Sequence, residues 1–311
     1  MVVDYGLHAE PISDLFEYPE TQEDWEPYIL SREQVDQFQE KGYVSGIRIL
    51  KDAQLEVLRS ELEEMVNPEH SGREFFYEYH TNESLNPETT LFHALGAWRV
   101  RPAYHDLLWA PGFRMAAYQL LGSGFRLFHD QLFCKPAHHG SVVSWHEDFS
   151  YWTWTSPMAH LTCWIALDDA TTENGCMYYV PESHKWGLVE RLDLAGDMDA
   201  VRNHLNEEQI KDFEKKVPVE LKAGYATFHH PLMMHGSYEN RSAKSRRATL
   251  INVFADGVIS NMEIAPETQP SSDNYPKIPK GENMAGTYYP LLWEDEDLPK
   301  NLKIPQVQPV L

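Results

Sequence analysis

Residues 125–134 read FRLFHDQLFC, and they open the part of the chain from which the fold class is predicted. From here on, short segments rich in Val, Ile, Thr and aromatic residues alternate with clusters of Pro, Gly, Asp and Asn. The other segments of this kind are 159–167, 176–180, 217–221, 225–229 and 248–254. Regularly spaced short strands with turn signals between them are typical of a β-sandwich or β-barrel. We therefore predict a mainly β domain.

The chain before residue 125 predicts helices that flank this domain. Ser31 and Gln34 have the spacing of a capping box, which begins a helix that ends at Gly42, before a strand at 43–50. A second helix has one apolar face, formed by Leu55, Leu58, Leu62 and Met65. A third helix is predicted at 112–121, between a proline and a glycine.

The chain divides into three segments in this interpretation. Residues 1–30 are acidic, lack a lasting period and form an N-terminal arm. Residues 31–256 form the domain, in which 191–216 are a charged, mostly helical insertion. Residues 257–311 are rich in proline and have little periodicity, so we expect a C-terminal extension that packs on the core as loops.

Composition excludes several classes of protein. The chain has 311 residues and a formal charge of −22, from 26 Lys and Arg against 48 Asp and Glu. Because this charge repels phosphate, nucleic acids and anionic membrane surfaces are not expected partners. There is no apolar run of about 18 residues for a membrane helix, and three irregularly spaced cysteines do not predict a disulfide scaffold. We expect a cytoplasmic, globular protein with a small-molecule partner, and the sequence carries no signal for its oligomeric state.

The segment WHED (145–148) is the first candidate for metal binding. Residues two apart in an extended segment point to the same side, so His146 and Asp148 are placed to bind one metal ion together. The dipeptide by itself is equally consistent with an exposed pair at the end of a strand.

Three further histidines, His229, His230 and His235, lie beside later predicted strands. A mononuclear non-haem iron site needs two imidazoles and one carboxylate on one face, with its other positions open. His146, Asp148 and one of these three histidines meet that need. The other two are then ordinary half-buried histidines, because an open site has no room for all three.

Arg246 and Arg247 begin the predicted strand 248–254. An arginine fixed on a strand binds a carboxylate through two parallel hydrogen bonds, although an arginine pair before a strand is also common at a solvated edge. Aromatic residues follow the first metal pair closely, and such residues line a substrate pocket or simply pack. They are Tyr151, Trp152 and Trp154.

Together these features resemble the phytanoyl-CoA dioxygenase family of Fe(II)/2-oxoglutarate-dependent oxygenases. The resemblance covers residues 31–254, and its motifs occur in the family's order. LSREQVDQFQEKGYV (30–44) resembles the first helix and strand of the family. His146 and Asp148 match its first metal pair, with Glu147 where the family often has Gln.

Three later stretches complete the resemblance. QLFCKP (131–136) resembles the strand that leads into the metal motif. NGCMYYVPESH (174–184) resembles an Asn-Gly…Pro-Gly-Ser-His stretch, with Glu182 in place of the usual Gly. GYATFHHPLMMHGS (224–237) matches the distal histidine motif. The combination is specific, although no single piece of it is.

The resemblance implies a role for each candidate residue. The metal ligands become His146, Asp148 and His235, which leaves His229 and His230 as structural residues. The residues implied at 2-oxoglutarate are Arg246, which grips the distal carboxylate, Ser237, which adds a hydroxyl, and Gln131 and Trp164, which flank the co-substrate. Tyr151 and Trp152 are expected at the substrate.

The fold implied by the resemblance is a double-stranded β-helix, a cupin-like jelly-roll barrel with flanking helices. The implied reaction uses Fe(II), 2-oxoglutarate and O2 to hydroxylate a small molecule, while 2-oxoglutarate is decarboxylated to succinate. One alternative is a non-catalytic jelly-roll binding protein of the same family. Another is a different oxidative outcome, such as desaturation or epoxidation, at the same iron site. Halogenating relatives vacate the carboxylate position, which Asp148 fills here, so hydroxylation is favoured.

Overall fold

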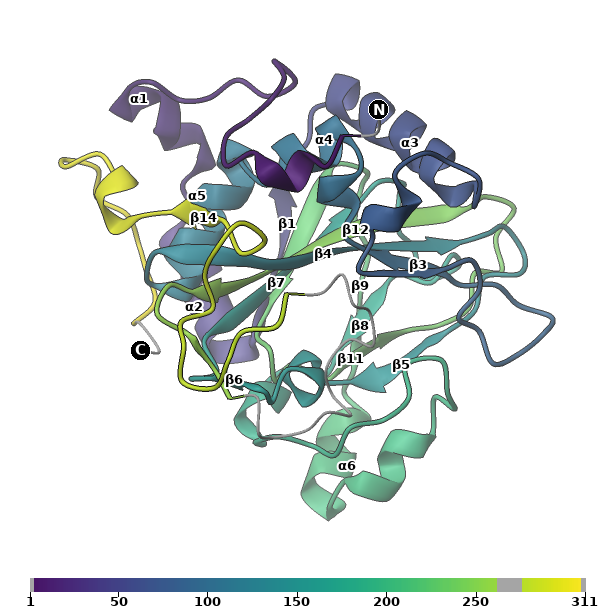
Figure 1. Cartoon of the computed structure of the whole chain (residues 1–311). Coiled ribbons are helices and arrows are strands. Elements are labelled where there is room, and N and C mark those ends of the chain that lie inside the picture. The colour runs from purple at the N-terminus through teal and green to yellow at the C-terminus, as the bar shows by residue number, and fades with distance from the viewer. Residues whose placement is uncertain (1–2, 262–275, 309–311) are drawn as a thin grey trace.

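Two long strands, β4 (Phe125–Lys135) and β12 (Arg246–Ala255), pair antiparallel at the centre of the larger of two facing sheets. The computed structural model describes residues 3–261 and 276–308. The larger sheet has the strand order β1-β10-β7-β12-β4-β3-β2, and β14 also pairs with β4 (Figure 1). The bounds of its other strands are Tyr43–Arg48 (β1), Glu78–His80 (β2), Phe92–Leu95 (β3), His160–Ala166 (β7), Tyr225–His229 (β10) and Leu291–Trp293 (β14).

The smaller sheet has the order β5-β11-β8-β9. Its strands are Val143–His146 (β5), Met177–Tyr179 (β8), Val217–Val219 (β9) and His235–Ser237 (β11). From β4 onward the chain passes back and forth between the two sheets, so that β5, β8 with β9, and β11 alternate with β7, β10 and β12. This path is that of a double-stranded β-helix.

Helices cover the outer face of the larger sheet (Figure 1). They are α1 (Gln22–Trp25), α2 (Arg32–Lys41), α3 (Asp52–Val66), α4 (Pro102–Leu107) and α5 (Pro111–Leu121), whereas α6 (Glu207–Phe213) lies below the smaller sheet. The predicted capping box of Ser31 and Gln34 is confirmed, and Gly42 ends α2 with φ +82°. Phe113 of α5 stacks on Phe228 of β10, so the main core lies between helices and sheet.

Single-turn 3-10 helices connect several of these elements. They are Tyr5–Leu7, Glu26–Tyr28, Arg73–Phe75, Ala97–Arg99, Asp148–Tyr151, Ser183–Lys185, Ala200–His204 and Asp295–Asp297. The expected mostly helical insertion at 191–216 is wrong, because only α6 and Ala200–His204 are helical in it. Its first part runs along β5 instead, where the Ser144 amide donates to the Leu194 carbonyl at 2.7 Å.

Both terminal segments pack on the domain. The ring of Trp25 meets that of Trp293 in β14 edge to face, at 5.1 Å between centroids. A two-stranded sheet joins β6 (Thr155–Ser156) to β13 (Ile259–Ser260). The part of the expected C-terminal loops at 262–275 lies outside the described residues. Among the described helices, none is both long and apolar enough to cross a membrane.

Candidate active site

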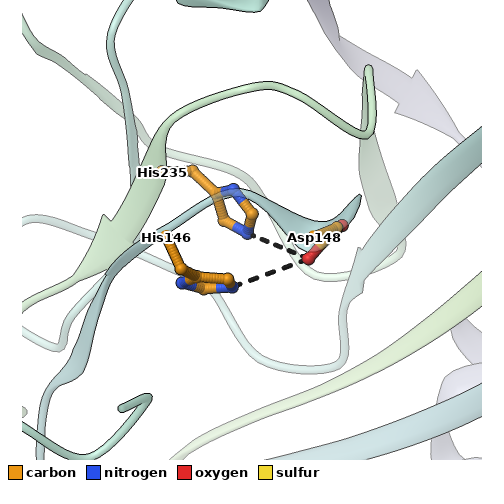
Figure 2. Close-up of side chains that lie close together, drawn as sticks. All are labelled: His146, Asp148 and His235. Carbon is orange, nitrogen blue, oxygen red and sulfur yellow. Dashed lines mark ion pairs between the residues drawn. The ribbon is translucent and has the colours of Figure 1, made fainter. Parts of the chain in front are cut away.

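The pairing of β5 with β11 brings together residues that are far apart in the sequence. His235 stands directly opposite His146 in this antiparallel pair, and Asp148 follows β5 after one further residue. The Nε2 atoms of His146 and His235 lie 3.6 and 3.7 Å from Oδ1 of Asp148 (Figure 2). One ligand atom from each of the three lies within 4.8 Å of the others, so the three side chains converge on one point.

Main-chain carbonyls orient both imidazoles. Nδ1 of His146 lies 2.7 Å from the Ser144 carbonyl, and Nδ1 of His235 lies 2.7 Å from the Met233 carbonyl. Each Nδ1–H therefore donates to the chain two residues earlier, which leaves the Nε2 lone pair directed toward Asp148. This is the arrangement that fixes the tautomer of a metal-binding histidine.

The Asp148 carboxylate uses its two oxygens differently. Oδ2 accepts hydrogen bonds from the Thr162 hydroxyl at 2.6 Å and from His229 Nε2 at 3.0 Å, while Oδ1 faces the two imidazoles. His229 is itself held by the Tyr179 hydroxyl, 3.0 Å from its Nδ1. Only Oδ1 of Asp148 therefore faces the metal-binding imidazoles. His229, which was expected to be structural, positions the carboxylate through Oδ2.

The electrostatics of the cluster favour the protonation states that metal binding needs. Burial alone raises the pKa of Asp148, but the neighbouring His235, His146 and His229 hold it well below its usual range. Burial, His146 and His229 lower the pKa of His235 well below its usual value. A charged carboxylate and neutral imidazoles with free Nε2 atoms are the donor set of a non-haem iron site, so the residues fit Fe(II).

A cavity of about 370 Å³ adjoins the three ligand atoms. Arg246 contacts both Ser237 and Trp164, and these three residues line one part of the cavity together with Met177 and Leu250, here called the inner end. A second part, here called the aromatic end, is lined by Arg191 against Tyr151, by Phe128 and His129 against Trp152, and by Trp154. Gln131, Glu83 and His93 also belong to the lining. The expected site residues therefore share one cavity with the three ligand side chains.

Arg246 and Arg247 point to opposite faces of β12. Arg246 is 1% exposed, and its Nη2 donates to the Gly175 carbonyl at 2.8 Å and to Ser237 Oγ at 3.3 Å. Its Nε has no hydrogen-bond partner among the described residues, and burial lowers its pKa to about 10. Arg247 binds Asp168 outside the cavity, at 2.9 Å. The Nε–H group of Arg246 is therefore available to a ligand at the inner end of the cavity.

The aromatic candidates line the other end. The Tyr151 hydroxyl donates to the Leu192 carbonyl, and the guanidinium of Arg191 lies 4.6 Å from the centre of the Tyr151 ring. Trp152 is 6% exposed and meets Phe128 edge to face. These contacts hold both rings as rigid walls of the cavity.

Glu83 and His93 form an ion pair that was not predicted from the sequence, and His93 also contacts Gln131. Glu83 lies 2.7 Å from Nδ1 of His93, whose Nε2 lies 3.0 Å from Oε1 of Gln131. Burial alone lowers the pKa of His93, but Glu83 raises it above its usual value. Glu83 lies in a loop without periodicity, and β3, which carries His93, is buried along its whole length. Neither segment has the alternation by which a strand is recognised.

Lys135 is the other residue that was missed. It ends β4, is fully buried, and its Nζ donates to Ser237 Oγ at 2.6 Å. The alternation of β4 was a usable signal, because Gln131, Phe133 and Lys135 are two apart and share one face. Gln131 and Phe133 line the cavity, so the same face leads to Lys135.

Comparison with known proteins identifies the family. The model of the phytanoyl-CoA dioxygenase family matches residues 38–248. A phytanoyl-CoA dioxygenase of Arabidopsis thaliana is 29% identical over 266 residues, covering 73% of this chain and 90% of that protein. An L-proline trans-4-hydroxylase of Streptomyces griseoviridis is 29% identical, covering 62% of this chain and 81% of its own.

Among solved structures, the non-heme alpha ketoglutarate dependent carbocyclase SnoK from nogalamycin biosynthesis has the same fold. Its TM-score is 0.68 at 23% identity, over 89% of this chain and 100% of SnoK. The fold and the relatives define a mainly β, jelly-roll protein related to dioxygenases and hydroxylases. The chain belongs to the phytanoyl-CoA dioxygenase family. The predicted family and fold class are confirmed.

Proposed function

We propose that this protein is an Fe(II)- and 2-oxoglutarate-dependent dioxygenase that hydroxylates a small-molecule substrate and converts 2-oxoglutarate to succinate. The observation that carries the proposal is the convergence of His146, Asp148 and His235 on one point of a cavity whose inner end holds Arg246. The hydroxylase activity named for the proline-specific relative and the cofactor dependence named for SnoK support it.

The metal cluster would hold Fe(II) through Nε2 of His146, Nε2 of His235 and Oδ1 of Asp148. Two neutral imidazoles and one carboxylate cancel only one of the two charges of Fe(II), so this donor set favours an anionic co-substrate beside it. When bound, Fe(II) with 2-oxoglutarate and O2 supplies the oxidising chemistry, which the chain itself does not perform.

Arg246 would bind the distal carboxylate of 2-oxoglutarate. Desolvating that carboxylate inside the barrel is costly unless a permanent cation pairs with it, and a guanidinium offers two parallel hydrogen bonds to two oxygens. Ser237, which already contacts Arg246, adds a hydroxyl. Trp164, with its ring centre 5.4 Å from the guanidinium carbon of Arg246, excludes water from this end of the cavity.

The aromatic end of the cavity would receive the primary substrate. Tyr151 and Trp152 follow the metal cluster within one 3-10 turn, so a substrate that contacts them lies next to the metal. Rigid aromatic walls keep a small molecule in one orientation at little entropic cost and exclude bulk water. Gln131, fixed by His93, stands opposite Leu250 of the inner end in the pairing of β4 with β12 and would flank the co-substrate.

The test supplies Fe(II), 2-oxoglutarate and O2 to the purified protein and screens small metabolites for oxygen-dependent succinate. A true substrate should give one hydroxylated product per succinate, and omission of O2 should stop both. If the protein binds Fe(II) and 2-oxoglutarate but forms no succinate with or without any candidate substrate, the non-catalytic binding protein is the better description.

A further inference from the structure

Lys135 is a buried basic group whose hydrogen-bond partners, among the described residues, include no carboxylate. Its side chain is fully buried at the end of β4. Its Nζ contacts three oxygens, namely Ser237 Oγ at 2.6 Å, the Tyr238 carbonyl at 2.6 Å and the Ser237 carbonyl at 3.2 Å. Three acceptors around one nitrogen match the three hydrogens of an ammonium group. The site can therefore accept all three hydrogens of a protonated lysine.

A second buried cation shares the same serine. Arg246 Nη2 donates to Ser237 Oγ from 3.3 Å, and the oxygens to which Arg246 and Lys135 donate belong to hydroxyl and main-chain carbonyl groups. Burial and then the charge of Arg246 lower the pKa of Lys135 well below its usual value. A carboxylate bound beside these two groups would offset the cost of burying their charge and favour the protonated lysine.

The two donors determine where the Ser237 hydroxyl points. A serine oxygen has two lone pairs and one hydrogen, and Lys135 and Arg246 together occupy the lone pairs. The hydrogen must then point away from both cations. Ser237 lines the cavity and Lys135 does not, so a hydroxyl hydrogen directed away from Lys135 can reach a ligand in the cavity. Lys135 therefore makes no direct hydrogen bond to such a ligand, and its hydrogen-bonding effect passes through Ser237.

Two glycines make room for this lysine. A Cβ at Gly175, where φ is +82°, would lie 3.3 Å from Lys135 Nζ and 2.4 Å from the Tyr238 carbonyl oxygen. A Cβ at Gly140 would lie 2.5 Å from the Cβ of Lys135. The surrounding chain thus approaches closely on two sides and fixes the position of the ammonium group.

We propose that Lys135 is a positioning residue for 2-oxoglutarate, which directs the Ser237 hydroxyl to the distal carboxylate and adds a second positive charge behind it. This inference rests on the proposed function. This role explains why Lys135 is buried next to Ser237. Without Lys135, the Ser237 hydroxyl could rotate away from the ligand.

The test compares two 2-oxo acids in anaerobic titrations of the Fe(II)-loaded protein. 2-Oxoglutarate has the distal carboxylate, and 2-oxovalerate has the same chain length without it. Lys135→Met should weaken 2-oxoglutarate binding about 10- to 100-fold, the range for a lost hydrogen bond to a charged group. Binding of 2-oxovalerate should change by less than about threefold, since that ligand lacks the carboxylate. The matched control Lys244→Met, at an exposed position, should affect neither ligand.

A double-mutant cycle separates positioning from mere packing. Ser237→Ala should also weaken 2-oxoglutarate, and adding Lys135→Met to it should cost much less than in the wild type, because the shared hydroxyl is already gone. Should Lys135→Met not fold, Lys135→Gln keeps a donor and should give an intermediate loss for 2-oxoglutarate alone.

Three outcomes in the variants, and one in the wild type, would overturn the inference. Equal weakening of both 2-oxo acids would make Lys135 a structural residue, and losses that simply multiply in the double variant would make it independent of Ser237. A wild-type affinity that Lys135→Met or Lys135→Gln leaves unchanged would remove its role altogether. A wild-type protein that binds Fe(II) but not 2-oxoglutarate would overturn the proposed function as well, and this is seen before any variant is made.

Discussion

The proposed binding of the distal carboxylate of 2-oxoglutarate is tested most directly at Arg246. Arg246→Ala would leave the distal carboxylate of 2-oxoglutarate buried and unpaired, and breaking a buried charge pair costs about 3–5 kcal/mol. The 2-oxoglutarate concentration needed for half-saturation should rise at least about a hundredfold, while Fe(II) still binds because the metal cluster is unchanged. Arg246→Lys should recover only part of the loss, because an ammonium lacks the planar fork.

Arg247 provides the matched control for this prediction. It is bound to Asp168 and Glu63 outside the cavity, at 2.9 and 3.0 Å. Arg247→Ala should therefore leave the affinity for 2-oxoglutarate almost unchanged. A large loss in Arg247→Ala with little effect in Arg246→Ala would show that the two side chains are assigned to the wrong faces.

Asp148 is expected to be the carboxylate ligand. Asp148→Gly removes one metal bond and one negative charge, and it leaves the Thr162 hydroxyl and His229 without their acceptor. Oxygen-dependent succinate formation should fall to background and Fe(II) affinity should fall strongly. The control Thr162→Val keeps the carboxylate and loses one hydrogen bond, so Fe(II) affinity should fall only about tenfold. Full activity in Asp148→Gly would exclude Asp148 as a ligand.

At single positions, the sequence was informative where a motif has fixed spacing. His146 and Asp148 are two apart, and the resemblance pointed to His235, so all three were expected together before the structure placed them so. The contact of His229 with Asp148 and that of Lys135 with Ser237 span 81 and 102 residues. Such contacts depend on which strands lie side by side, which no local spacing reveals.

Glu182, which stands where the family usually has Gly, lies in the turn after β8. Its φ is +72°, a conformation that costs a non-glycine residue about 1–2 kcal/mol. Its carboxylate binds Lys41 at 2.8 Å and Lys185 at 3.2 Å, and exposed ion pairs of this kind contribute little to stability. Glu182→Gly should therefore change the free energy of unfolding little, because relief of the backbone strain offsets the loss of the two ion pairs.

Glu182→Ala should be the least stable of the three, because it keeps the backbone strain and loses both ion pairs. Denaturant unfolding of the wild type and the two variants would give this order. If the alanine variant is as stable as the glycine variant, backbone strain at this turn is not significant.

Among whole elements, the sequence predicted those with a strong period or a clear end. The capping box of α2, the apolar face of α3 and the long strand β4 were all expected. β2 and β3 were missed because they are short and β3 is buried on both faces, so it shows no alternation. Residues 191–216 were expected to be charged and mostly helical, but in their first part the Leu194 carbonyl accepts from Ser144 of β5.

On the scale of the whole molecule, the buried histidines should contribute a loss of stability in mild acid. Burial lowers the pKa of His129, His160 and His230 to about 3, whereas a histidine in the unfolded chain titrates near 6.5. Below pH 6.5 the unfolded state binds protons that the folded state does not. The stability that these three histidines contribute is therefore fully present above that pH and is lost as the pH falls toward 3.

Each of these histidines should lower the free energy of unfolding by about 1.4 kcal/mol between pH 7.5 and 5.5. His93 acts in the opposite direction, because its pKa is raised. The carboxyls of Glu61 and Asp130, whose pKa burial raises to about 7, and of Glu147, whose pKa burial raises to about 8, also act in the opposite direction. The histidine contribution is therefore measured by comparing a variant with the wild type in denaturant unfolding of the metal-free protein at the two pH values. Relative to the wild type, His160→Asn should be about 1.4 kcal/mol more stable at pH 5.5 than the comparison at pH 7.5 gives, and an identical difference at both pH values would contradict this account.

The overall architecture followed from the sequence only through the resemblance. Regular short strands predicted a sandwich or barrel, but they did not show that β11 pairs with β5 and places His235 opposite His146. That register depends on how often the chain crosses between the two sheets. The whole-molecule topology therefore turns a weak local pair, His146 and Asp148, into a three-residue metal cluster.

The most direct test of the central claim is an anaerobic titration of the Fe(II)-loaded protein with 2-oxoglutarate. The wild type should develop the weak visible charge-transfer band of a chelated 2-oxo acid, saturating at one equivalent per chain. His235→Ala should lose the band. The matched control His230→Ala should keep it, because the His230 ring packs on His184 and does not contact Asp148. An unchanged band in His235→Ala, or none in a wild type that binds Fe(II), would contradict the account.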